Sequence, residues 1–249
     1  MQPEGRSVTA EVDLERLAIG YTHRPASTAA LARAAGAVVD LGEGSIALDI
    51  GGGLGEHAAV WAARGVRSIV LDPSWIMVEA ANRRTGVTAL RARSQAVPLR
   101  NGVADLAYFH LSIHYGDWRR ALTEARRALR PGGICEIWTL GSEHHRTSNL
   151  ARWFPSVAAI DSARFPEPDE MATFLGGLGR PVEQVRVVER AERRVGDWTQ
   201  AVRAGFVSTL QLVPSTELEY GLGAFRAAHP DPAETFVYEL KFDRIVAQR

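Results

Sequence analysis

The stretch Leu48–Glu56, LDIGGGLGE, decides the fold of this chain. It ends a short apolar run, 46–50, and leads into a helix-favouring segment, 56–64. A buried strand that runs through closely spaced glycines into a helix is typical of a nucleotide-binding turn, because glycine lets the backbone approach a ligand. Such a turn can hold a phosphate, a dinucleotide or an adenosyl group, and the spacing of its residues distinguishes them.

Two of these ligands do not match the spacing. A P-loop needs a lysine directly after its last glycine, whereas Gly55 is followed by Glu56. The dinucleotide fingerprint needs its third glycine at the position of Glu56, and a pyrophosphate is a poor neighbour for Asp49. What remains is an acid followed by Gly51, Gly53 and Gly55. An acid at the end of the first strand suits a ligand with a cationic amino group.

A second acid follows the next apolar run, 68–71. Asp72 stands 17 residues beyond Gly55, where the end of a second parallel strand would let it accept hydrogen bonds from ribose hydroxyls. Together, Asp49 and Asp72 favour S-adenosylmethionine as the ligand of the turn.

The rest of the chain alternates apolar runs with helix-favouring segments. This order predicts a mostly parallel, doubly wound α/β sheet. Strands are expected at 46–50, 68–71, 87–92, 105–111, 134–140, 182–188 and 235–246, and helices at 27–39, 56–64, 75–84, 118–129, 168–175, 197–206 and 216–228.

Composition narrows the class of partner. The 29 basic and 29 acidic residues balance, which argues against nucleic acid or an anionic membrane as partner. Cys135 is the one cysteine, which suits a reducing compartment, and no segment has the apolar length of a signal or a membrane span. We therefore expect a cytoplasmic protein, a monomer or homodimer, that acts on a small molecule.

Four motifs in order carry a family resemblance: LDIGGGLG, VLDPS (70–74), AVPLRNGVADLAY (96–108) and ALTEARRALRPGG (121–133). Over residues 21 to about 179 the sequence resembles the class I S-adenosylmethionine-dependent methyltransferases, in the small-molecule group that includes the ubiquinone/menaquinone type. The resemblance implies a Rossmann-like sheet of seven strands, the last antiparallel and within 235–246. It also implies a helical lid made by the N-terminal segment and by the insertion after the fifth strand.

The resemblance implies one methyltransferase domain over residues 1–249. Its expected parts are an N-terminal helical lid segment (1–42), a cofactor-binding core (43–140), a substrate lid insertion with C-terminal helices (141–232) and a final strand (233–249).

Cofactor-binding residues are carried over one by one. Asp49 would contact the methionine amino group and Asp72 the ribose. Where the family usually has an acid for the adenine amino group, this chain has Arg93, which cannot accept a hydrogen bond, so Ser94, Gln95 or the backbone must serve. The expected cofactor-binding set is Asp49, Gly51, Gly53, Gly55, Asp72, Pro73, Ser74, Ser94, Gln95 and His110.

The segment HLSIHY, 110–115, would stand where the methionine tail and the methyl acceptor meet. If the acceptor is a hydroxyl, a base must remove its proton, and the candidates are His114, His144 and His145. His144 and His145 are adjacent and lack further ligands at metal spacing, so no metal is expected. Alternative roles stay open for several residues: core packing for His110, and packing or acceptor binding for the expected substrate-binding residues Tyr21, Tyr115 and Trp153.

The sequence therefore predicts transfer of a methyl group to an O, N or C atom of a small molecule, with S-adenosylhomocysteine as product. The alternative is a non-methylating S-adenosylmethionine-binding protein, either another enzyme or a regulatory module, which the departure at Arg93 encourages. A nucleic-acid methyltransferase is disfavoured because HLSIHYGDW, 110–118, lacks the Asn/Asp-Pro-Pro-Tyr/Phe sequence.

Overall fold

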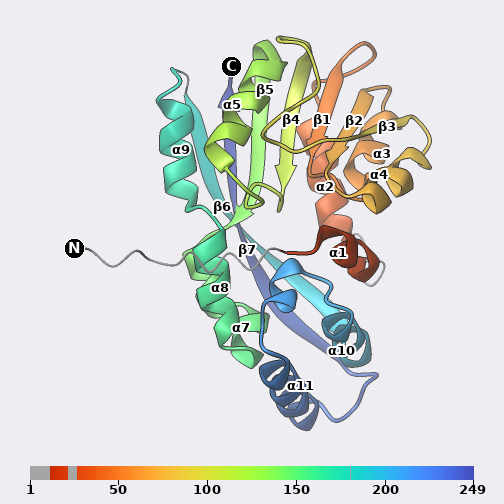
Figure 1. The fold of residues 1–249 in the computed structure, drawn as a ribbon, viewed down its shortest axis with the longest axis vertical. Helices are drawn as coiled ribbons and strands as arrows, with labels where there is room; N and C mark the ends of the chain where they lie inside the picture. Colours follow the sequence, from red (N-terminus) through yellow and green to blue (C-terminus); the bar gives the residue numbers. More distant parts are fainter. Residues whose placement is uncertain (1–11, 22–26, 180) are drawn as a thin grey trace.

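A seven-stranded sheet forms the centre of the computed structural model, which describes residues 12–21, 27–179 and 181–249 (Figure 1). The strand order is β3-β2-β1-β4-β5-β7-β6, and β7 runs antiparallel to both of its neighbours. The strands are β1 (Ile46–Ile50), β2 (Arg67–Asp72), β3 (Val87–Arg91), β4 (Ala104–His110), β5 (Leu129–Leu140), β6 (Val182–Arg194) and β7 (Thr235–Gln248). The predicted fold class is confirmed.

Helices cover both faces of the sheet. In chain order the described helices are α1 (Leu14–Tyr21), α2 (Thr28–Ala37), α3 (Glu56–Ala62), α4 (Trp75–Asn82), α5 (Trp118–Ala128), α6 (Ser142–Thr147), α7 (Asn149–Trp153), α8 (Ser156–Arg164), α9 (Pro168–Gly176), α10 (Val195–Arg203), the 3₁₀ turn η1 (Ser208–Gln211) and α11 (Ser215–Ala228). The sequence predicted α2 to α5 and α9 to α11 within a few residues, but not α1, α6, α7, α8 or η1.

Two apolar layers pack against the sheet. On one face, α5 and α9 bury Leu122 and Met171 against strand residues such as Phe109. On the other face, α2, α3 and α4 bury Ala34 and Trp61 against β1, β2 and β4. α5 is strongly amphipathic, which explains why its position was evident from the sequence.

Local hydrogen bonds fix where elements begin. Asp117 caps α5 by accepting from the Arg120 amide at 3.1 Å. Asp105 accepts from the Ile46 amide at 2.7 Å and pairs with Arg130, which ties β4 to β1 and β5.

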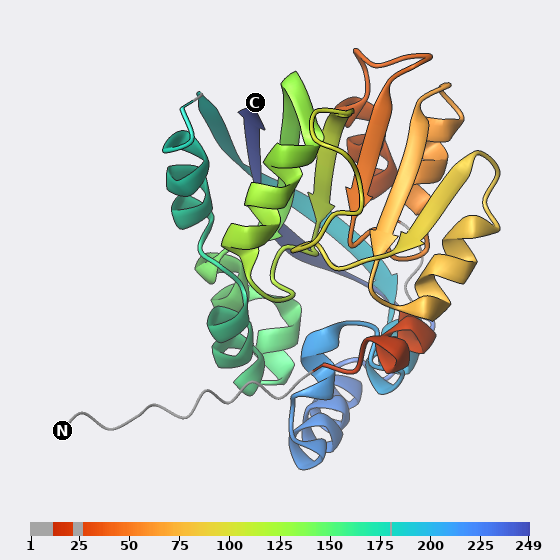
Figure 2. The same ribbon diagram turned by 45° about the horizontal axis from the view of Figure 1, so that its top comes forward.

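A cap stands beyond the carboxyl ends of the parallel strands. β6 and β7 pair along 182–194 and 235–247, whereas β5 pairs with β7 only along 242–248. The free half of this ribbon carries α10, η1 and α11, with α7 and α8 beside them (Figures 1 and 2). The cap has a separate core built around Phe154, Trp198, Phe225 and Phe236.

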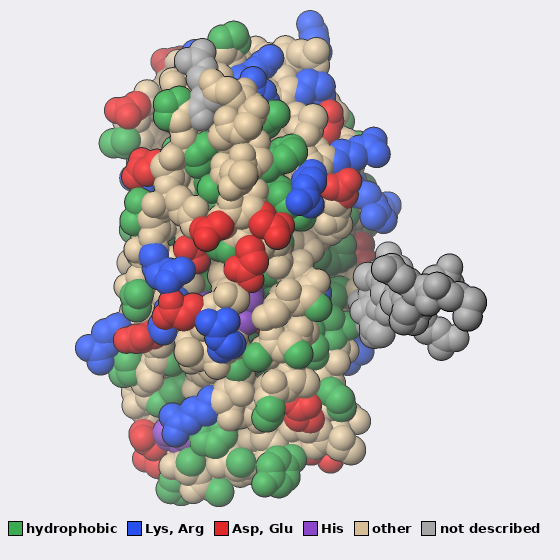
Figure 3. All heavy atoms as spheres, turned by 90° about the vertical axis from the view of Figure 1, so that its left-hand side faces the viewer, with side chains coloured by type: hydrophobic (Ala, Val, Ile, Leu, Met, Phe, Trp, Pro, Cys, Tyr) green, Lys and Arg blue, Asp and Glu red, His purple; other side chains and the backbone are tan. Residues whose placement is uncertain are grey.

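Charged side chains of both signs lie on the side of the molecule that carries α8 and α9, among hydrophobic and other side chains (Figure 3). β6, an edge strand, contributes Arg186 and Glu183, which face Glu143 and Arg244 respectively. Charges along an edge strand oppose pairing with another sheet. Among the described residues, no helix combines the length and the apolar character needed to cross a membrane.

The cap core generates a stability prediction. Trp198 is 1% exposed and packs on Phe225, with ring centroids 4.1 Å apart. Trp198→Ala should lower the free energy of unfolding by about 3–5 kcal/mol, because a large cavity replaces the indole. Urea unfolding, monitored by circular dichroism, measures this change in the free energy of unfolding. The control Trp75→Ala removes an indole that is 53% exposed and should change the value by less than about 0.5 kcal/mol. Equal effects would contradict the prediction.

Candidate functional site

A sharp turn after β1 brings three strand ends together. The Gly51 amide donates to the Leu71 carbonyl of β2 at 2.7 Å, and the Ser112 hydroxyl, just beyond β4, donates to the Ile50 carbonyl at 2.5 Å. Gly51 has a φ of +71°, and a Cβ there would lie 2.5 Å from Ser112 Cβ. Glycine is therefore required at Gly51, as expected for a residue that lines the turn.

Asp49 ends β1 as a buried carboxylate. It is 1% exposed, and among the described residues neither side-chain oxygen has a hydrogen-bond partner. His57 of α3 lies nearby, with 3.6 Å between its Nδ1 and Asp49 Oδ2. Because a buried carboxylate without hydrogen bonds is costly, Asp49 suits a ligand that brings a cationic amino group.

Asp72 ends β2 one strand away. Its carboxylate accepts hydrogen bonds from the amides of Gly53 at 3.0 Å and Ser74 at 2.9 Å. Burial raises the pKa of Asp72 to about 6, against the effect of these two donors, and the charges of Asp49 and Glu15 raise it further. The two acids that the sequence singled out therefore lie in one electrostatically coupled site.

An open wall lies beside the two acids at Gly53. Its φ is +53°, and the atoms nearest to a Cβ there would be Met77 Sδ at 3.7 Å and Tyr21 Cε1 at 4.0 Å. Tyr21 of α1 therefore lies over the glycine turn. His23, in the same expected lid segment, lies outside the described residues.

Glu15 ties α1 to the start of α4. Its carboxylate accepts from the Ser74 hydroxyl and the Trp75 amide, both at 2.8 Å, and from the Ile76 amide at 3.3 Å. These hydrogen bonds, that from Ser74 above all, lower the pKa of Glu15. Trp75 and Ile76 are 53% and 41% exposed and border the same corner. The sequence did not single out Glu15, since its partners lie 59 to 61 residues away.

The residues that the sequence places near the adenine of the cofactor differ in solvent exposure and in their hydrogen bonds. Arg93 is exposed. Ser94 is half-buried. Gln95 donates from Nε2 to the Tyr115 carbonyl at 3.0 Å, so its side-chain amide supports the loop after β4. The Pro73 carbonyl accepts from Arg91 at 3.0 Å.

His110 ends β4 within a polar group that the sequence did not reveal. Its Nε2 lies 2.9 Å from Nη2 of Arg33, and because arginine only donates, Nε2 is the acceptor. Arg33, on α2, also pairs with Glu189 and lies over the ring of Phe242, 4.5 Å from its centroid. His110 is thus held at the strand end from the side of α2.

A second cluster lies where β4 and β5 end. His114 stacks on Phe165, with ring centroids 3.8 Å apart, and its ring lies 4.1 Å from that of Tyr115. His145 of α6 is 4.9 Å from Phe165. Burial holds the pKa of His114 well below its ordinary value and lowers that of His145 to about 4. The structure therefore brings together three of the predicted residues: His114, His145 and Tyr115.

Two predicted residues are placed elsewhere. His144 faces β7, where its Nδ1 accepts from the Lys241 amide at 3.2 Å, and burial lowers its pKa to about 4. Trp153 packs beside the cap core, with its ring 5.3 Å from that of Phe225. Both side chains have structural contacts that account for their positions. Within the described part of the chain, no group of three or more His, Cys, Asp or Glu could hold a metal ion.

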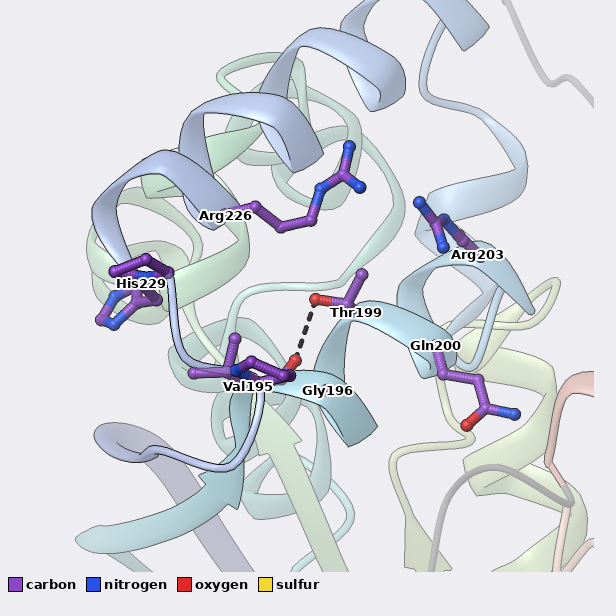
Figure 4. A pocket seen from close by; sticks show the side chains of 9 residues that line it. Val195, Gly196, Thr199, Gln200, Arg203, Arg226 and His229 are labelled. Carbon is purple, nitrogen blue, oxygen red and sulfur yellow. Dashed lines mark hydrogen bonds between the residues drawn. The ribbon is translucent and has the colours of Figure 1, made fainter.

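A hollow of about 490 Å³ lies in the cap, between α10, α11 and the turn 229–232. Arg203 projects from α10 and Arg226 from α11 (Figure 4). Each arginine belongs to the last turn of its helix, where positive charge offsets the helix dipole. None of the residues lining the hollow belongs to the two clusters at the strand ends.

Residues 48–137 match the protein family described as a methyltransferase domain. The malonyl-[acyl-carrier protein] O-methyltransferase of Salmonella typhimurium is 38% identical over 95 residues, which is 37% of this chain and 38% of that protein. The matched part therefore spans about two fifths of this relative's length.

Solved structures match over most of the chain. A protein of Anabaena variabilis, described as a methyltransferase of an antibiotic biosynthesis pathway, has a TM-score of 0.73 at 18% identity and covers 87% of this chain and 96% of its own. The geranyl diphosphate C-methyltransferase of Streptomyces coelicolor, in complex with Mg²⁺, geranyl diphosphate and S-adenosyl-L-homocysteine, has a TM-score of 0.54 at 16% identity and covers 88% of this chain and 78% of its own. At these identities the likeness is one of fold.

The raised pKa of Asp72 predicts a pH dependence of stability. The folded-state value of about 6 lies above the ordinary aspartate value, so the folded protein binds this proton more tightly than the unfolded chain. The stabilisation is full below about pH 4 and is lost as the pH rises through 6. We compare the free energy of unfolding of the wild type with that of Asp72→Asn. The wild-type value minus the variant value should fall by up to about 3 kcal/mol between pH 4 and pH 7. Urea unfolding at each pH measures it, and a constant difference would contradict it.

Proposed function

We propose that this chain is a class I S-adenosylmethionine-dependent methyltransferase that transfers a methyl group from S-adenosylmethionine to an oxygen, nitrogen or carbon atom of a small molecule. The methyltransferase-domain match over residues 48–137 and the fold support this proposal. The observation that carries the proposal is the pair of buried acids beside an open glycine wall. Asp49 has no hydrogen-bond partner among the described residues, and Asp72 lies across the turn from it.

The residues present fit this cofactor. Asp49 would receive its amino group, since a buried carboxylate is best satisfied by a cation. Asp72 keeps its carboxylate oriented through the Gly53 and Ser74 amides and would accept from the ribose hydroxyls. Gly53 leaves room for a bulky group next to the backbone. When bound, the cofactor supplies an activated methyl group on a sulfonium.

The protein's task in such a reaction is to position the acceptor and exclude water. Tyr21 lies over the glycine turn, and the cap faces the strand ends (Figure 2). His114, Tyr115 and His145 would line the acceptor side, and His114 and His145 are the candidate bases. His144 is less suited to that role, because its Nδ1 already accepts from Lys241.

The acceptor of the Salmonella relative does not carry over. The family match ends at residue 137, before α6 to α8 and α10 to α11, which build the acceptor side here. We therefore leave the acceptor as a small molecule whose identity depends on the cap.

Calorimetric titration of S-adenosylmethionine and S-adenosylhomocysteine tests the cofactor site. Wild type should bind both, and Asp49→Asn and Asp72→Asn should each weaken binding at least about tenfold, because each loses a charge-assisted hydrogen bond to the ligand.

The matched control is Glu219→Gln, an acid-to-amide change at an exposed position of α11, which should leave the affinity unchanged. NAD serves as the rival ligand. The proposal fails if neither adenosyl ligand binds, or if NAD binds in their place.

A further inference from the structure

The hollow in the cap has a shape that the backbone fixes. Its volume of about 490 Å³ lies within the range of small-molecule sites, about 300–1,000 Å³. The Gly196 amide of α10 donates to the Pro232 carbonyl at 2.9 Å, and a Cβ at Gly196 would lie 3.1 Å from that oxygen. The Val195 amide donates to the Glu234 carbonyl at 2.9 Å. These hydrogen bonds join the turn 229–232 to the start of α10 and so set the width of the hollow.

The floor of the hollow is apolar. Val195 is 2% exposed, and Pro230 and Pro232 line the hollow from the turn. The Thr199 hydroxyl donates to the Val195 carbonyl at 2.8 Å, so this polar group is satisfied within its own helix (Figure 4). Such a floor favours contact with an apolar group, because burial of apolar surface is stabilising.

Two arginines from different helices open on the same hollow. Arg226 reaches from α11 toward α10, where Arg203 projects (Figure 4). Within the described part of the chain neither guanidinium forms an ion pair, and the hydrogen bond of Arg226 Nε, 3.4 Å long, goes to the Leu222 carbonyl of its own helix. The helix dipole accounts for an arginine in the last turn of each helix. It does not account for two arginines without carboxylate partners on one hollow.

The acids near the hollow lie at its other end. Asp197 belongs to the first turn of α10, Asp231 lies in the turn bonded to it, and Glu234 follows that turn. Glu234 Oε1 is 3.5 Å from Nδ1 of His229. Arg203 stands in the last turn of α10, roughly 9 Å along the helix axis from Asp197. The hollow therefore has a positive end, formed by arginines that no acid neutralises.

We propose that this hollow binds an organic anion, an apolar group that carries a carboxylate or a phosphate. A guanidinium pairs with either head through two parallel hydrogen bonds, and the floor takes the apolar group. A cationic ligand would be repelled by the arginines, and a neutral one would gain no charge-assisted hydrogen bond from them. None of the residues that line the hollow belongs to the strand ends. The inference therefore adds a second binding site and does not rest on the proposed methyl transfer.

Calorimetric titration of the full-length protein with matched probes tests the ligand class. The anionic probes are hexanoate and hexyl phosphate, and hexanol and hexylamine are their neutral and cationic counterparts. At least one anionic probe should bind saturably, and hexanol and hexylamine should not. Acetate or inorganic phosphate, which has the same head without the apolar group, should bind at least about tenfold more weakly than the corresponding hexyl probe.

Variants of the hollow locate the binding. Arg203→Gln and Arg226→Gln should each weaken binding about tenfold or more, because each removes a charge-assisted hydrogen bond. Gln200→Trp keeps both arginines but fills part of the hollow, and should weaken binding as well. The matched control is Arg83→Gln, at the C-terminal cap of α4, an exposed helix-end arginine that should leave the Kd unchanged. Circular dichroism verifies that each variant is folded.

Three results would overturn the inference. They are no saturable binding of either anionic probe up to about 10 mM, equal binding with and without the apolar group, and an unchanged Kd in both arginine variants. Displacement of the probe by S-adenosylhomocysteine would also overturn it, because the two ligands would then share one site. A failure of the methyl-transfer proposal leaves these outcomes unaffected.

A second measurement places the probe without any change to the hollow. In protein labelled with ¹⁵N at histidine, the anionic probe that binds should shift the ring nitrogen resonances of His229, which borders the hollow. The resonances of His57, beside Asp49, and of His145 at the strand ends should stay in place. Single His→Gln variants assign the signals. Unmoved His229 resonances at saturating probe would contradict the placement.

Discussion

The sharp turn after β1 is the constraint on which the site depends. Hydrogen bonds from Gly51 to the Leu71 carbonyl and from Ser112 to the Ile50 carbonyl clamp the ends of β1, β2 and β4 together. The clamp needs a residue without a side chain, because a Cβ at Gly51 would collide with Ser112. Once it forms, Asp49 and Asp72 must arrive side by side, since parallel strands present their carboxyl ends at one edge of the sheet. Their repulsion and burial are destabilising, and a cationic ligand relieves both.

The site has two electrostatic halves of different origin. The sheet and its glycine turn supply an acidic half, which suits a cationic cofactor. α6, α8 and the loop after β4 supply a half with neutral imidazoles and aromatic rings, which suits a neutral acceptor. Transfer of a methyl cation between two such halves needs little covalent chemistry from the protein and much alignment. The family match, residues 48–137, includes both acids of the acidic half and ends before α6 and α8 of the neutral half.

The same division separates what the sequence could predict from what it could not. Strands and the amphipathic α5 follow from local periodicity, and Asp49, Gly51 and Asp72 follow from their spacing along one strand–helix–strand unit. Residues 142–164 were not predicted as helices, because the run is short, polar at its start and interrupted by Pro155. The contacts around the site are long-range: Ser74 donates to Glu15 from 59 residues away, and Arg33 donates to His110 from 77 residues away. Such pairs leave no local pattern, so only the folded chain reveals them.

Ser74 connects α1 to the acidic half. Its amide donates to Asp72 and its hydroxyl donates to Glu15 of α1, so one residue links α1 to the buried acid at the end of β2. The pKa values of the Glu15 and Asp72 carboxylates shift in opposite directions. Glu15 is half-buried and caps the start of α4, and its hydrogen bonds lower its pKa, whereas burial raises the pKa of Asp72. As the pH falls through 6, Asp72 therefore takes up a proton while Glu15 stays ionised. The contact that holds α1 over the glycine turn thus persists through the titration of the acid beneath it.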